Sequence, residues 1–151
     1  MRPLLLVLVV TLAGSVESRA QATQPLARAT LFGQVAGDGL ALSLNADYMV
    51  TPQINARVGY STAIFAQGIP LVVSYHMGEG RRRLEVGGGT LINLTDGEDD
   101  PTAFGLVHAG YRVHPRGRGW LFRVGFALVF DPEDIVLLPG VSVGRGLRLG
   151  R

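Results

Sequence analysis

Residues 120–130, WLFRVGFALVF, decide the fold class of this chain because large apolar side chains occupy every second position. The opposite face of the segment carries Arg123, Gly125 and Ala127. Such alternation is the pattern of a β-strand whose two faces meet different surroundings. We therefore expect a strand that is apolar on one side and small or charged on the other. The apolar positions are Trp120, Phe122, Val124, Phe126, Leu128 and Phe130.

The same alternation recurs along the chain, and 21 Gly and 8 Pro interrupt it at short intervals, which is typical of an all-β protein. Strands of this length suit a tilted bilayer crossing, which needs about 9–11 residues, better than the usual globular strand of about 5–6. An even number of strands closes a sheet without an edge, so the sequence predicts an eight-stranded antiparallel up-and-down transmembrane β-barrel. The predicted strands are residues 29–36, 40–50, 54–64, 70–77, 84–94, 104–113, 120–130 and 141–149.

The start of the chain has the features of a cleavable export signal. Arg2 precedes an apolar run at residues 4–13, and residues 20–22, Ala-Gln-Ala, form a small-x-small cleavage site. The apolar run is about half of the roughly 20 residues that a membrane-spanning helix needs. The predicted domains are a signal peptide over residues 1–22 and one barrel domain over residues 23–151. With no cysteine in the sequence, neither a disulfide nor a lipid-modified cysteine is expected.

Charge is nearly balanced but is segregated among the connections between strands. The chain has 14 basic and 12 acidic residues, and removing residues 1–22 leaves 12 against 11, which gives no reason to expect a nucleic-acid partner. In an up-and-down barrel alternate connections lie at opposite ends, so we expect the acidic connections outside and the basic turns in the periplasm. Ordinary solvated loops remain the alternative. The acidic connections are residues 37–39, 95–100 and 131–134, and the basic ones are residues 78–83 and 115–119.

Five charged residues fall on the polar faces of the predicted strands. They are Asp47, Arg57, Glu85, Arg112 and Arg123. Because an eight-stranded barrel is only just wide enough for side chains to fill it, these residues are predicted to form an ionic network that plugs the lumen. A narrow polar conduit is the alternative.

Other chemistry receives little support from the sequence. His76 and His108 are expected to point inward near Glu85, but no zinc-binding spacing is present, so a structural role is favoured. His114 is expected at a turn. Neither Ser74 nor Ser142 lies in a nucleophile-elbow motif. We therefore predict no catalytic residue, cofactor or metal.

Two charged segments are candidates for weak surface contacts. The acidic residues 96–100 offer oxygen ligands for Ca²⁺ or Mg²⁺, although they fail the EF-hand pattern, and a solvated loop is the default interpretation. The arginines at 81–83 suit anionic lipid headgroups or periplasmic polymers, or form a charged turn without a partner. Aromatic residues near the predicted strand ends suggest interfacial girdles. These are Tyr48, Tyr60, Tyr75, Tyr111 and Trp120.

Several short motifs resemble those of small, uncharacterised outer-membrane β-barrel proteins, in the size class of OmpA and OmpX. The motifs are Gly-Tyr-Arg at 110–112, Pro115 and Gly117 in a short turn, residues 121–126 and 139–144, with similar segments at 43–45 and 57–59. The resemblance implies a bacterial outer-membrane location, with membrane lipid and the barrel-insertion machinery as partners. It brings no catalytic residues. Such barrels typically end in an aromatic residue, whereas this chain has Leu147 there and Arg145 at an outward position.

The expected function is that of an integral outer-membrane barrel with a structural or interaction role and without enzymatic activity. Two alternatives remain open. A soluble periplasmic or secreted lipocalin-like barrel would bind a small apolar ligand and would turn its apolar face inward. A narrow small-solute pore would share the membrane fold and would differ only in an open lumen.

Overall fold

The computed structural model describes residues 25–63, 66–95, 102–130 and 134–148. The predicted export signal and the acidic segments at 96–100 and 131–133 lie outside these residues. Across the described ranges, no helix has the length and apolarity needed to cross a membrane.

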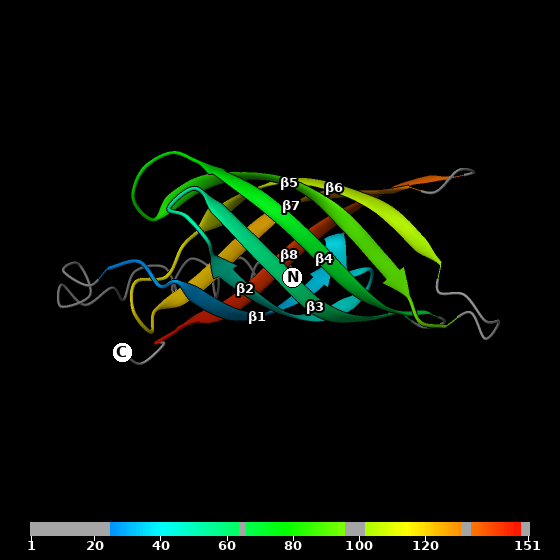
Figure 1. Ribbon diagram of the computed structural model, residues 1–151, viewed down its shortest axis with the longest axis horizontal. Helices are drawn as coiled ribbons and strands as arrows, with labels where there is room; N and C mark the ends of the chain where they lie inside the picture. Colours follow the sequence, from blue (N-terminus) through cyan, green and yellow to red (C-terminus); the bar gives the residue numbers. More distant parts are fainter. Residues whose placement is uncertain (1–24, 64–65, 96–101, 131–133, 149–151) are drawn as a thin grey trace, which may run out of the picture.

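Eight antiparallel strands follow one another around a closed barrel, and β1 pairs with β8 to complete it (Figure 1). The predicted all-β, eight-stranded up-and-down barrel is therefore confirmed. A short 3₁₀ turn, η2, covers Gly37–Gly39. The strands are β1 Ala29–Ala36, β2 Leu42–Met49, β3 Ile54–Ala63, β4 Ala66–Met77, β5 Arg82–Asn93, β6 Ala103–Val113, β7 Trp120–Phe130 and β8 Ile135–Leu147.

Five strand starts differ from the prediction, two of them only slightly, because β2 begins at Leu42 instead of 40 and β6 at Ala103 instead of 104. β8 begins at Ile135 instead of 141, β4 at Ala66 instead of 70, and β5 at Arg82 instead of 84. In β8, residues 135–138 lack alternation and the following Pro139 and Gly140 look like a turn. Pairing overrides this local signal, because β7 hydrogen-bonds along its full length and residues 135–145 are its partners.

The two ends of the barrel differ in their connections. The β2–β3, β4–β5 and β6–β7 connections define the end that we call the turn end, and the other connections define the loop end. The strand faces follow the predicted alternation, with mostly polar and small residues inside, a smaller set of buried apolar residues among them, and large apolar residues exposed outside. Among the described strand residues, the only charged side chains at exposed outward positions are Arg82 and Arg145, both near the turn end.

The lumen is filled in layers that can be followed along β5. Leu91, near the loop end, belongs to an apolar cluster with Val72, Leu106 and Val129. Glu85 lies further along and is fully buried, and Arg83 follows it towards the turn end. The interior is therefore apolar near the loop end and charged from the middle onward.

The β1–β2 turn folds into the barrel, which corrects the prediction that residues 37–39 form an exposed acidic connection. Asp38 is only 2% exposed. Leu40, expected as the first residue of a strand, instead packs against the apolar cluster. The flanking residues Ala36 and Leu40 have φ values of 57° and 58°, a conformation that disfavours side chains other than glycine. The turn is therefore held in a strained conformation by its contacts inside the lumen.

Close strand packing makes one inward glycine essential. A Cβ atom at Gly144 on β8 would overlap Phe32 and the Leu31 carbonyl of β1, whereas a Cβ at Gly33 meets nothing nearer than 4.0 Å. We expect Gly144→Ala to destabilise the barrel by about 1–3 kcal/mol. Gly33→Ala should have little effect. Urea unfolding of both variants, followed by tryptophan fluorescence, measures the difference, and equal midpoints would contradict this packing.

Candidate functional site

Charged side chains from five strands converge in the middle of the lumen. Each of the five predicted residues is at most 6% exposed. Asp47 and Arg57 are direct cross-strand neighbours on β2 and β3, so their pairing is local. Arg112 and Arg123 also lie opposite each other, on β6 and β7. Two adjacent like charges repel, so acids must reach them from elsewhere in the barrel.

Glu85 is the carboxylate that reaches most of these arginines. Its Oε1 accepts from Arg57 Nη2 at 2.7 Å and lies 3.3 Å from Arg123 Nε. Its Oε2 lies 3.4 Å from Arg112 Nη1. Glu85 therefore pairs with arginines from three strands, β3, β6 and β7, of which only β6 is a neighbour of β5.

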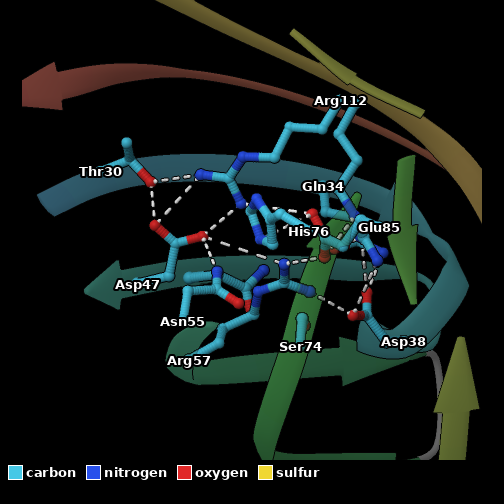
Figure 2. A network of polar contacts seen from close by, with 12 residues as sticks. Thr30, Gln34, Asp38, Asp47, Asn55, Arg57, Ser74, His76, Glu85 and Arg112 are labelled. Carbon is cyan, nitrogen blue, oxygen red and sulfur yellow. Dashed lines mark hydrogen bonds and ion pairs between the residues drawn. The ribbon is translucent and has the colours of Figure 1, made fainter. Parts of the chain in front are cut away.

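Asp47 binds Arg112 through both of its oxygens. Arg112 Nη1 donates to Oδ2 at 2.6 Å and Nη2 donates to Oδ1 at 3.3 Å. Asn55 donates to Oδ2 at 2.9 Å, and the Thr30 hydroxyl donates to Oδ1 (Figure 2). This fork geometry orients Arg112 and satisfies the buried carboxylate with several donors.

Asp38 completes the network, although the sequence interpretation placed it on the surface. Arg57 Nη1 donates to its Oδ2 at 2.5 Å, and Arg123 contacts both oxygens at 3.2 and 3.3 Å. Gln34 donates to Oδ1 from β1. Burial alone would raise the pKa of Asp38, but the guanidinium groups of Arg57 and Arg123 outweigh it and hold the pKa below its usual value. The carboxylate therefore stays charged.

A charge count on the sequence contains the signal that would have found Asp38. The five predicted residues comprise three arginines and two acids, and buried charges need partners. One further acid was required. Asp38 lies between two glycines that permit an unusual turn, and it brings the predicted set to three acids and three arginines, to which the structure adds Arg83 as a fourth buried arginine.

The inward histidines, His76 and His108, flank Glu85. His108 Nε2 lies 3.0 Å from Glu85 Oε1 and 3.2 Å from Ser74 Oγ, so serine and acid share one ring nitrogen. The other ring nitrogen, Nδ1, lies 3.7 Å from Asp38 Oδ2, which is beyond hydrogen-bond distance. His76 Nε2 lies 3.8 Å from Glu85 Oε2. Within the ranges that the structure covers, no group of three or more potential metal ligands occurs.

His114 ties the β6–β7 connection to the segment before β1. Its Nδ1 accepts from Arg112 Nε at 3.2 Å, and its Nε2 donates to the Ala27 carbonyl at 2.8 Å. Burial and the neighbouring Arg112 lower its pKa to about 4. The ring is therefore neutral at pH 7, with its proton on Nε2.

The lowered pKa of His114 predicts a loss of stability between about pH 6.5 and about pH 4. In this window the unfolded residue binds a proton and the folded one does not, so the free energy of unfolding falls as the pH falls. Substitution His114→Gln removes this titration and should make the pH dependence shallower. Unfolding temperatures measured between pH 4 and 7 test this, and parallel profiles of both proteins would contradict it.

The basic segment at 78–83 divides between the surface and the lumen. Arg82 is exposed, whereas Arg83 is 8% exposed and points inward, because β5 starts earlier than predicted. Arg83 Nε donates to the Gly80 carbonyl at 2.9 Å, and its Nη1 donates to the Pro52 carbonyl. The sequence does contain a signal for the inward position of Arg83: the residue lies two positions before Glu85, so both side chains point to the same face of the strand.

The predicted interfacial aromatics are all exposed, and four of them cluster near the turn end. Tyr60 lies towards the loop end and donates to Gln67 Oε1 at 2.7 Å. Trp120 lies beneath the Arg145 guanidinium, 5.0 Å from the ring centre, in a cation–π contact. The four at the turn end are Tyr48, Tyr75, Tyr111 and Trp120.

Comparisons with known proteins show the fold alone. No protein-family model matches the chain, and no curated protein matches it. The chain is similar to the crystal structure of the N-terminal β-barrel domain of Pseudomonas aeruginosa OprF. The TM-score is 0.60 at 13% sequence identity, and the match covers 80% of this chain and 98% of that domain.

Proposed function

We propose that this protein is an integral outer-membrane β-barrel with a plugged lumen and a structural or interaction role, without catalysis. The observation that carries the proposal is the polarity of the two faces: the charged side chains are buried inside, and the exterior is apolar. A bilayer accepts such an exterior, and closure by β1–β8 pairing leaves no unpaired strand edge.

The soluble lipocalin-like alternative requires the opposite arrangement of faces. Such a barrel would expose polar strands to water and line a cavity with apolar residues. Here Phe126 on β7 is 59% exposed, whereas Glu85 and Arg112 are completely buried. The structure therefore gives the soluble alternative no support.

The pore alternative requires a continuous open lumen. The charged network fills the middle, and the apolar cluster with Leu40 lies between it and the loop end. The re-entrant η2 turn brings Asp38 into this network (Figure 2). These layers support a plug instead of a conduit.

The turn end suits the periplasmic interface. Exposed tyrosines and the Arg145–Trp120 pair lie there, and both outward arginines can extend to headgroups. The proposed partners are outer-membrane lipid and the insertion machinery, which would meet β8 at the outward Leu147.

Envelope fractionation combined with electrophoresis of unboiled and boiled samples tests the membrane assignment. We expect recovery with outer membranes and a heat-dependent change in migration. Recovery in the soluble periplasm, without a heat-dependent change in migration, would contradict the proposal. Planar-bilayer recordings test the plug separately, since regular channel openings would favour the pore over the plug.

A further inference from the structure

The buried charges of the described lumen do not balance. Four arginines are buried, but only three acids are. Arg57, Arg112 and Arg123 each form ion pairs with at least two of these acids. The fourth, Arg83, forms no ion pair with a described carboxylate and lies directly opposite Arg112 on the neighbouring strand. A buried cation of this kind favours an anion beside it.

Arg83 lines a cavity of about 220 Å³ at the turn end. Two of its nitrogens donate to the carbonyls of Gly80 and Pro52, which hold the guanidinium in place. The third nitrogen, Nη2, has no hydrogen-bond partner in the described part of the chain. It is also not completely enclosed by protein atoms. This nitrogen therefore keeps its hydrogen-bonding capacity.

The rest of the described lining is mostly apolar, and it includes a second cation, Arg28, and the polar residues Thr51 and His114. Arg28 is exposed and forms no ion pair with a described acid. Among the described residues, no acid lines the cavity, and His114 is neutral at pH 7. The apolar walls come from Leu26, Ala27, Met49, Val50 and Pro52.

We propose that this cavity binds a small organic monoanion, a carboxylate that carries a short aliphatic chain. The carboxylate meets Arg83 Nη2 and is attracted by Arg28, while the chain lies against Met49 and its apolar neighbours. Because Arg83 is already oriented by two carbonyls, little side-chain freedom is lost on binding. The volume is below the roughly 300–1,000 Å³ of pockets for drug-sized ligands, which limits the chain to a few carbons.

Calorimetry with the folded full-length barrel in a zwitterionic detergent tests the site, with hexanoate, hexan-1-ol and inorganic phosphate as probes. We expect hexanoate to bind at least tenfold more tightly than hexan-1-ol or phosphate. Equal binding of the alcohol would overturn the role of the cation, since it would reflect partition onto apolar surface. Equal binding of phosphate would overturn the aliphatic part of the ligand.

Matched variants assign the binding to this cavity. Arg28→Glu and Arg83→Gln should each weaken hexanoate binding at least tenfold, whereas Arg82→Glu, the same charge reversal at an exposed position outside the cavity, should leave it within twofold. Arg28 has an exposed side chain, so its variant keeps the test decisive even where Arg83→Gln fails to fold. Equal losses in Arg28→Glu and Arg82→Glu would overturn the site in favour of general attraction to a basic surface.

Discussion

Substitution Glu85→Gln should lower the free energy of unfolding by about 3–5 kcal/mol, the usual effect of removing one partner from a buried ion pair. The amide keeps the shape of the side chain but removes the negative charge that Arg57, Arg112 and Arg123 share. The arginines Arg57, Arg112 and Arg123 would then share only two acids, Asp38 and Asp47. Titration of the heat-modifiable gel band with urea measures the change.

The matched control is Glu79→Gln, which makes the same chemical change at an exposed position in the β4–β5 connection. Exposed charges contribute little to stability, so this variant should unfold like the wild type. Similar midpoints for Glu85→Gln and Glu79→Gln would contradict a pairing role for Glu85.

Asp38→Asn should have a comparable effect on stability and a distinct effect on the β1–β2 turn. The variant loses the charge that holds η2 against Arg57 and Arg123, while the unfavourable φ values at Ala36 and Leu40 remain. We expect a loss of about 3–5 kcal/mol, together with faster amide hydrogen exchange confined to residues 36–40. Hydrogen exchange followed by mass spectrometry measures this local change.

Ala36→Gly separates strain from charge in the same turn. Glycine adopts the observed φ of 57° without steric conflict, so this variant should be more stable than the wild type by about 1 kcal/mol. Unchanged exchange at residues 36–40 in Asp38→Asn would show that the carboxylate does not hold the turn inside the barrel.

The sequence predicts the strands well because alternation is a local signal that the barrel uses on every strand. It also predicts that Asp47 and Arg57 point inward, and the structure adds that they lie opposite each other on strands joined by a short turn. The start of β8 was missed because Pro139 and Gly140 resemble a turn, and only pairing with β7 extends the strand through them. Local propensity and long-range pairing disagree there, and pairing determines the structure.

The remaining parts of the site depend on contacts that no local pattern contains. Asp38 enters the lumen through a turn whose non-glycine residues adopt left-handed φ values, against their own preference. Arg83 changes from a turn residue to a lumen residue because the strand begins two positions earlier. Both positions follow from packing across the barrel, which brings together residues such as Thr30 and Arg112 that lie 82 positions apart.

The distribution of the network over separate strands also bears on how the barrel assembles. Glu85 and Arg57 meet across the lumen from strands that are not neighbours, so the contact between them forms only after the sheet curls. A slip of one residue in any of the five strands that carry a buried charge would turn that charge towards lipid and the apolar residues of the strand inward. Folding intermediates with a wrong register are therefore raised in energy, and closure with every strand in register becomes a single cooperative event.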